Sequence, residues 1–311
     1  MLPKINRAVL SILICLAMLI SMTINAPARQ PAKSSTHKLR ENIHAGSVPK
    51  GVVIRSAAAL VEDQRTGELL LQKKAHAVVP IASITKLMTA MVVLDSGSDL
   101  NELITIEAAD VDTFRHSYSR LPVGAQLTRG DLLLVSLMAS DNRSAHALGR
   151  VYPGGVAACV AAMNDKARSL GLFKTRFVDT TGLYSGNVSS ARDLVRLVEA
   201  AYGYPLIREF STCREAVVDS GTRVLEFRNT NSLLLHPEWE IGLSKTGYIG
   251  ESGRCLVMQA RLAERSLFIV LLDSQGKLTR IGDANRIKKW LETSGKDLRT
   301  SRYPIRTDPA G

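Results

Sequence analysis

Segments with the character of β-strands lie near both ends of this chain, and segments with helical periodicity lie between them. A turn-rich stretch at 63–67 separates the first two strand-like runs, which predicts a β-hairpin. Strands that are distant in sequence can bury their apolar faces by sharing one sheet. We therefore predict an α+β fold, with an antiparallel sheet built from both chain ends plus a mainly helical lobe. The predicted strands are 57–62, 68–72, 239–246, 255–262 and 266–273.

The middle of the chain carries the helical signals. Apolar residues recur at three- and four-residue steps over 83–94, which is the period of an amphipathic helix. Thr128 and Asp131 have the spacing of a capping box in front of the apolar run 132–138, which predicts a second helix there. Further helices are predicted at 142–151, 156–170, 191–201 and 281–291.

The N-terminus has the organisation of an export signal. Lys4 and Arg7 precede an apolar run at 8–22, and small residues follow at 26–28. This order predicts a signal peptide over 1–28, and therefore an exported protein. An uncleaved N-terminal membrane anchor is the alternative, because the apolar run is close to the shortest length that spans a bilayer.

Composition divides the rest of the chain into three parts. Residues 29–50 are polar, basic and aperiodic, which predicts a flexible leader. Residues 51–293 contain all the predicted strands and helices and form the expected folded domain, and 294–311 is expected to be a loose C-terminal tail. No stretch after residue 25 is apolar for the roughly 18 residues that a membrane span needs, so at most a loose membrane association is expected.

Lysine and arginine exceed aspartate and glutamate by 40 to 29, which gives a formal net charge of +11. An excess of this sign suits nucleic acid, an anionic membrane face or a polyanionic cell wall as a partner. Because the predicted signal peptide would take the protein out of the cytoplasm, the sequence argues against nucleic acid and favours the wall.

Cysteine and histidine patterns give no support to a metal site. Cys159, Cys213 and Cys255 follow the predicted signal peptide without any C-x-x-C spacing. They allow at most one disulfide within the chain, and we expect small buried apolar residues instead. The six histidines are scattered without an H-x-H or H-E-x-x-H pattern, so a zinc hydrolase is not supported.

Three short motifs occur in order along the chain: S-x-x-K at 83–86, S-D-N at 140–142 and K-T-G at 245–247. Each is weak by itself, since S-x-x-K also occurs at 35–38 and at 274–277. A single serine before an apolar helix is usually a helix cap, and S-D-N or K-T-G alone is usually a turn or a surface bend. Their joint occurrence in an exported basic protein predicts catalysis.

The first motif places a lysine beside a serine hydroxyl. On a helix, residues i and i+3 lie on one face about 5 to 6 Å apart, so Lys86 can bring its amine to Ser83. A lysine that acts as a base near pH 7 must be neutral, which requires a downward pKa shift of roughly three units. Repulsion from a second nearby ammonium, that of Lys245, could supply this shift.

The same serine is placed to stabilise negative charge on a substrate. Ser83 is expected at a helix N-terminus, where the helix dipole is positive and its own backbone N–H can serve as one oxyanion donor. The second predicted donor is the backbone N–H of Tyr248.

The other two motifs supply groups for substrate contact and proton transfer. Ser140 is a candidate proton relay toward a leaving amine, and Asn142 is a candidate donor to a substrate amide. Lys245 and Thr246 would offer a cation and a hydroxyl to a ligand carboxylate, and Gly247 would let a substrate backbone approach the strand closely.

Together these residues resemble the serine D,D-peptidases, the low-molecular-mass penicillin-binding proteins that act on bacterial peptidoglycan. The similarity runs over about 57–291 and is greatest to the D-alanyl-D-alanine endopeptidases among them. It is densest at 80–95, 152–155, 227–231 and 245–247.

The resemblance implies the β-lactamase and D,D-peptidase fold, with 51–293 as the transpeptidase-like catalytic domain and no metal or organic cofactor. It also implies that Ser83 is the acyl-ester nucleophile, Lys86 the proton acceptor, Ser140 the second catalytic serine and Lys245 the substrate-binding lysine. One departure is Asp141, where similar proteins carry an acid one carbon longer. We expect no mechanistic change from it.

The implied activity is periplasmic hydrolysis of peptidoglycan cross-links through an acyl-enzyme, as part of cell-wall remodelling, with β-lactams as covalent inhibitors. The chain stops soon after the last predicted helix, which leaves no room for the extra β domain and amphipathic anchor of related carboxypeptidases. This favours a soluble endopeptidase, although a D-alanyl-D-alanine carboxypeptidase would use the same site.

Two further alternatives remain. A β-lactamase needs a carboxylate that activates water against the acyl-enzyme, but 175–183 carries only Asp179 and no E-x-x-x-N pattern. We therefore expect slow deacylation and a penicillin label that persists. A non-catalytic wall-binding or penicillin-sensing protein is disfavoured because all three motifs are complete.

Overall fold

The computed structural model describes residues 48–221 and 223–301, with side chains up to residue 293. All of them belong to one compact unit, Gly46–Gly311. The predicted signal peptide at 1–28 and nearly all of the predicted leader at 29–50 lie outside the described residues. The boundaries of these segments therefore stay predictions.

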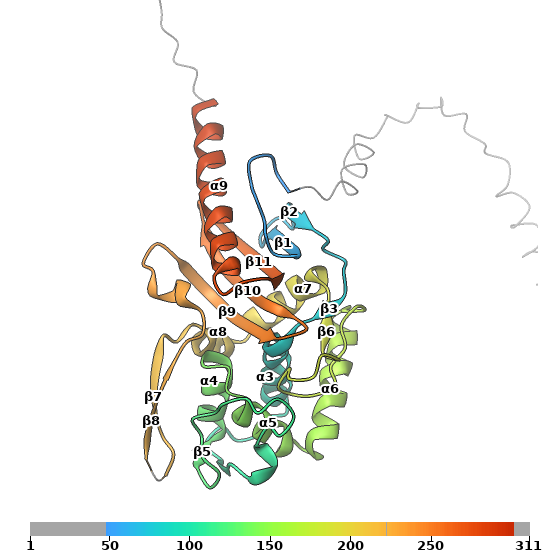
Figure 1. The fold of residues 1–311 in the computed structure, drawn as a ribbon, viewed down its shortest axis with the longest axis vertical. Coiled ribbons are helices and arrows are strands. Elements are labelled where there is room, and N and C mark those ends of the chain that lie inside the picture. Colours follow the sequence, from blue (N-terminus) through green and yellow to red (C-terminus); the bar gives the residue numbers. More distant parts are fainter. Residues whose placement is uncertain (1–47, 222, 302–311) are drawn as a thin grey trace, which may run out of the picture. The chain divides into compact units, whose positions relative to one another are not determined.

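Five antiparallel strands form the central sheet in the order β2-β1-β11-β10-β9 (Figure 1). β1 pairs with β11, so that Leu60 lies opposite Val270 although the two are far apart in sequence. The predicted α+β fold with a sheet from both chain ends is confirmed, as is the hairpin of β1 and β2. The strands are β1 (Ala58–Asp63), β2 (Leu69–Lys73), β9 (Glu240–Ile249), β10 (Gly253–Leu262) and β11 (Arg265–Ser274).

Both faces of the sheet are buried, which explains why its inner strands are nearly continuous apolar runs in the sequence. On one face, Leu60 and Val270 join the core of the helical lobe. On the other face, Val61 and Ile269 pack in a second core with the apolar side of α9 (Thr279–Ser301). The sheet is therefore held between the lobe and α9, and β9 is the edge strand that faces the site described below.

The lobe is built around one helix, α3 (Thr85–Asp95). Residues 85–93 are all buried, because helices α4 to α8 all contact α3. The sequence predicted an amphipathic helix here, whereas the structure surrounds it on all sides. The neighbouring helices are α4 (Arg129–Met138), α5 (Asn142–Arg150), α6 (Gly155–Ser169), α7 (Ala191–Tyr202) and α8 (Pro205–Thr212).

Several elements differ from the sequence predictions. α9 continues to Ser301, ten residues beyond its predicted end and into the expected loose tail, whose last residues, 302–311, lie outside the described part. Helix α8 and the hairpin of β7 (Glu215–Asp219) and β8 (Val224–Arg228) were not predicted. Val217 and Val224 lie on the exposed face of this hairpin, so apolar residues occur on both of its faces and the alternation of a half-buried strand is obscured.

Short elements connect these parts. The remaining strands are β3 (Val79–Pro80), β4 (Leu103–Thr105), β5 (Gln126–Thr128) and β6 (Val188–Ser189). The 3₁₀ turns are η2 (Ala82–Ile84), η3 (Ala108–Asp110) and η4 (Ser232–Leu235). None of the helices in the described ranges combines the length and apolarity that a bilayer span requires.

Candidate active site

Ser83 lies in the 3₁₀ turn η2, directly before α3, and two glycines allow other segments to approach it closely. A Cβ atom on Gly247 of β9 would lie 2.8 Å from the carbonyl oxygen of Ile81 and 3.2 Å from the backbone nitrogen of Ser83. A Cβ atom on Gly182 would collide with the carbonyl oxygen of Ala82. The missing side chain of Gly247 makes room for the turn that carries the serine. The close approach of a substrate backbone at Gly247 stays a prediction.

Replacing Gly247 by alanine is expected to slow acylation of Ser83 by about ten- to a hundredfold, because the added methyl group must displace β9 from the nucleophile. The rate of labelling by a fluorescent penicillin measures this effect. Gly250→Ala is the matched control, since no atom lies within 4 Å of a Cβ added there. Equal rates in the two variants would contradict the proposed importance of this contact.

Lys86 is completely buried one helical turn after Ser83. Its Nζ donates to Ser83 Oγ at 2.9 Å, to Asn142 Oδ1 at 2.7 Å and to the carbonyl oxygen of Thr181 at 2.6 Å. Burial lowers the pKa of Lys86 to about 8, although the negative charge of Asp179 partly opposes the shift. The amine is therefore held against the serine hydroxyl and is partly neutral near pH 7.

The cause of this shift differs from the expected one. Repulsion from Lys245 was the predicted cause, whereas burial is the largest influence on the pKa of Lys86. Lys245 is itself buried, and burial together with the charges of Lys86 and Arg280 lowers the pKa of Lys245 well below its usual value. The two amines thus share one buried region, in which the charge of one disfavours the charge of the other.

Ser140 connects the second motif to the third. It lies between α4 and α5 with a left-handed backbone (φ 61°), a conformation that is costly for a residue with a side chain and is often found at functional sites. Lys245 Nζ donates to Ser140 Oγ at 2.8 Å. All three predicted motifs therefore meet in space, since Lys86 contacts Asn142 and Lys245 contacts Ser140.

Asn142 and Asp141 bind the loop that contains Ser117 and Ser119, and so hold it beside the site. Asn142 Nδ2 donates to Ser117 Oγ at 2.8 Å, so a substrate amide oxygen would have to replace this hydroxyl to use the predicted donor. Asp141 caps α5 by accepting the backbone N–H of Ser144 at 2.9 Å and also accepts from Ser119 Oγ at 2.6 Å. The carboxylate of Asp141 therefore holds the start of α5 and the segment around Ser119 in place, and it accepts no hydrogen bond from Lys86 or Lys245.

The third motif lies inside β9, which the sequence analysis expected to end at it. Thr246 Oγ1 lies 2.6 Å from Thr230 Oγ1, which fixes its side chain. The Tyr248 ring is 57% exposed and packs under the Arg254 guanidinium group at 4.4 Å from the ring centroid. β9 is an edge strand of the sheet, and the oxyanion role of the Tyr248 N–H stays a prediction.

Sequence reasoning missed Arg280 in the first turn of α9. Its side chain is buried, it donates to the carbonyl oxygen of Gly247 at 3.4 Å, and its Nε has no hydrogen-bond partner among the described residues. Burial lowers the pKa of Arg280, and repulsion from Arg254 adds to this. No sequence motif marks this residue, because its position depends on the packing of α9 against β10 and β11.

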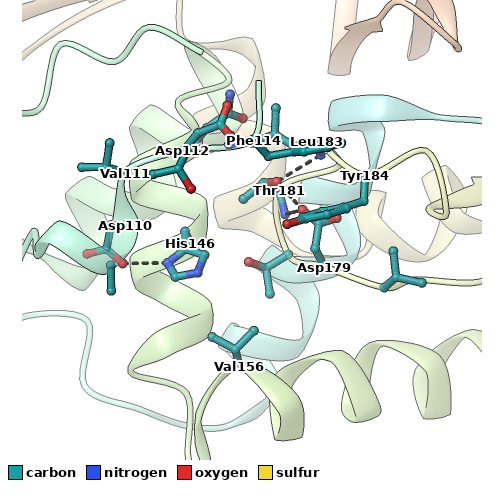
Figure 2. Close-up of a pocket in the computed structure, with 15 residues that line it drawn as sticks. Asp110, Val111, Asp112, Phe114, His146, Val156, Asp179, Thr181, Leu183 and Tyr184 are labelled. Atoms are coloured by element: carbon teal, nitrogen blue, oxygen red, sulfur yellow. Dashed lines mark hydrogen bonds and ion pairs between the residues drawn. The ribbon is translucent and has the colours of Figure 1, made fainter. Parts of the chain in front are cut away.

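A cavity of about 380 Å³ opens beside the lysine contacts, with Asn142 and Thr181 in its wall. Figure 2 shows His146 and Asp110 joined on one side of it, with Nδ1 of the imidazole 2.8 Å from the carboxylate. The remaining lining includes a pair of stacked rings and two further carboxylates. The rings belong to Phe114 and Tyr184, 4.8 Å apart and nearly parallel, and the carboxylates to Asp112 and Asp179.

No metal site is visible in the part of the chain that the structure describes, and two of its three cysteines are buried. No three His, Cys, Asp or Glu side chains gather there in a way that could hold a metal ion. The three cysteines are free, and burial raises the pKa of Cys159 to about 12 and that of Cys255 to about 11. These two thiols are therefore protonated at neutral pH.

Comparison with known proteins gives a consistent result. A family model for D-alanyl-D-alanine carboxypeptidase, Peptidase S11, matches residues 44–276. The D-alanyl-D-alanine endopeptidases of Pseudomonas aeruginosa and Escherichia coli are 48% and 43% identical, each over 77% of this chain and 78% of the relative. A solved DD-transpeptidase of Streptomyces superposes with a TM-score of 0.72 at 27% identity, over 79% of this chain and 99% of that one.

Proposed function

Because this chain belongs to the Peptidase S11 family, described as D-alanyl-D-alanine carboxypeptidase, it is a serine D,D-peptidase, and we propose that it acts as an endopeptidase on D-alanyl cross-links of peptidoglycan. The observation that carries the proposal is the 2.9 Å contact between Lys86 Nζ and Ser83 Oγ, made by an amine whose pKa is lowered to about 8. The endopeptidase names of the two relatives with 43% and 48% identity favour this activity over carboxypeptidase activity.

The reaction begins at Ser83. Its hydroxyl oxygen attacks the carbonyl carbon of the D-alanyl residue while its proton passes to neutral Lys86. Because the pKa of Lys86 is about 8, about a tenth of the protein has this base available at pH 7. The backbone N–H groups of Ser83 and Tyr248 receive the developing oxyanion.

Ser140 and Lys245 act on the leaving amine. When the C–N bond breaks, the Ser140 hydroxyl gives its proton to the departing nitrogen and takes one from Lys245, whose Nζ lies 2.8 Å away. Thr246 and Lys245 hold the carboxylate of the leaving residue beside β9. Water then attacks the ester carbonyl of the acyl-enzyme and gives a proton to the neutral Lys245, while the Lys86 ammonium group returns its proton to Ser83 Oγ. The ester C–O bond breaks, Ser83 is restored, and the released D-alanyl acid loses its proton to solvent.

The surroundings of Asp179 support a slow second step, and thus lasting inhibition by β-lactams. Its carboxylate accepts the backbone N–H of Gly182 at 3.1 Å, and the side chains of Thr181 and Asn187 also donate to it. A carboxylate engaged in this way has little capacity left to activate water. A penicillin on Ser83 should therefore stay attached for minutes or longer.

We place this activity in the periplasm, on the basis of the predicted signal peptide at 1–28 and the net charge of +11, which suits travel along an anionic wall. The substrate is the peptide part of peptidoglycan, and the consequence of cleavage is remodelling of the wall.

Digestion of purified muropeptides tests the proposal. The protein is expected to convert cross-linked dimers to monomers and to release terminal D-alanine from pentapeptide monomers more slowly, as measured by mass spectrometry of the products. Faster release of D-alanine with intact dimers would identify a carboxypeptidase instead. No turnover of either substrate, with binding retained, would point to a non-catalytic wall-binding protein.

A further inference from the structure

A second cavity, of about 430 Å³, lies beside Ser140 and is rich in arginine. Its lining residues come from the loop before β5, the end of α4 and strand β8. They are Arg120, Ala139, Glu226, Phe227 and Arg228. No part of the mechanism above uses this cavity.

The walls of this arginine pocket are anchored to the catalytic motifs. Ala139 directly precedes Ser140 in the chain, and Arg120 follows Ser119, whose hydroxyl donates to Asp141 at 2.6 Å. On the β8 side, Thr230 lies two residues after Arg228. The backbone N–H of Thr230 donates to the carbonyl oxygen of Met138 at 3.2 Å, and the Thr230 hydroxyl lies 2.6 Å from the Thr246 hydroxyl. A group bound in this pocket would therefore be held in a fixed position relative to Ser140 and Thr246.

The two arginines of the pocket form no ion pair with the described residues, although Glu226 lines the pocket and Glu215 lies opposite Arg228 in the pairing of β7 with β8. Arg120 and Arg228 are both exposed, and neither forms an ion pair with any carboxylate in the described chain. Glu226 is the one acidic lining residue. By contrast, Arg115 near the site is paired with Glu251 at 2.7 Å. Two free guanidinium groups in one pocket match carboxylates, which they can bind through paired hydrogen bonds.

We propose that the arginine pocket, formed by Arg120 and Arg228, binds carboxylates of the leaving peptide and so selects cross-linked substrates over terminal D-alanine. This inference rests on the proposed function, in which Ser140 protonates the leaving amine. The peptide that carries this amine must pass Ser140 and Ala139 as it leaves the reaction centre. A terminal D-alanine has one carboxylate, which Lys245 and Thr246 already bind, whereas a cross-linked stem peptide brings further carboxylates.

The test compares two substrates in two proteins. In the double variant Arg120→Gln, Arg228→Gln, kcat/KM for a cross-linked muropeptide dimer is expected to fall about tenfold, the effect of two partly exposed charge pairs. The value for a pentapeptide monomer should change less than twofold. Arg214→Gln is the matched control, because Arg214 is an exposed arginine at the base of the same hairpin that does not line the pocket.

A chemical change in the substrate makes the test specific. Amidation of the free carboxylates on the leaving stem of the dimer, other than the one next to the leaving amine that Lys245 and Thr246 hold, should lower kcat/KM about tenfold for the wild type. It should have little effect on the double variant, since the groups that recognise these carboxylates are then absent. Penicillin labelling and thermal unfolding should be unchanged in all variants, which excludes misfolding as the cause.

Three outcomes would overturn the inference. Equal losses on dimer and pentapeptide would mean that the arginines support the site in general. Unchanged dimer cleavage, or full sensitivity of the double variant to amidation, would mean that the pocket does not bind the leaving stem. If the wild type itself leaves dimers intact but releases D-alanine, the endopeptidase proposal fails and this inference fails with it.

Discussion

Ser83→Ala is expected to lose covalent labelling by penicillin completely and to lower the cleavage of cross-linked dimers by about 10⁴-fold or more, since removing a nucleophile removes the acyl-enzyme route itself. The hydroxyl is the group that Lys86 contacts at 2.9 Å, and no other hydroxyl accepts from this amine in the described chain. Intact-mass spectrometry after incubation with a β-lactam measures the adduct directly, and product analysis of dimers measures turnover.

The chain offers a matched control for this variant. Ser274 also begins an S-x-x-K sequence, but its hydroxyl is buried in the sheet 2.8 Å from that of Ser56. Ser274→Ala should keep the adduct and the activity. An adduct that persists in Ser83→Ala, or one that disappears in Ser274→Ala at unchanged stability, would contradict the assignment of the nucleophile.

Lys86→Arg is expected to reduce the acylation rate about 10³-fold, because arginine keeps the positive charge but does not release its proton at accessible pH. In the wild type, the rate should rise about tenfold per pH unit up to pH 8 and then level off. The sign follows from the active form: the neutral amine is the base, and its fraction falls as pH drops below the folded pKa of about 8.

Stopped-flow acylation by a chromogenic β-lactam between pH 5 and 9.5 gives this profile. Lys166→Arg provides the control, since Lys166 binds Asp95 and Tyr204 on another part of the molecule. A rate that does not change over this pH range, or an Arg variant with normal rates, would show that Lys86 is not the proton acceptor.

Contacts among the candidate catalytic residues were predictable where their geometry is local. Ser83 and Lys86 are separated by one helical turn, so their spacing alone predicts the contact that the structure contains. The capping of α4 is local in the same way, with the Asp131 N–H donating to Thr128 Oγ1 at 3.0 Å. That Ser140 would meet Lys245 followed from the joint occurrence of the motifs and not from their spacing, since the contact depends on the whole fold.

Features that depend on tertiary packing were not predictable in this way. The lowered pKa of Lys86 comes first from burial, which requires the segment around Thr181 to cover the amine. Arg280 reaches the site because α9 packs behind the sheet. The β7–β8 hairpin was missed because exposed Val217 and Val224 break the apolar pattern of a buried strand.

The pairing of β1 with β11 has a consequence for how the protein matures. Ala58 and Leu272 are partners in the sheet although more than 200 residues separate them. The backbone groups on this edge of β1 can therefore form their hydrogen bonds only after β11 has been synthesised. The central sheet, including the edge strand β9 that carries Lys245, is therefore complete only after the C-terminal strands have been synthesised.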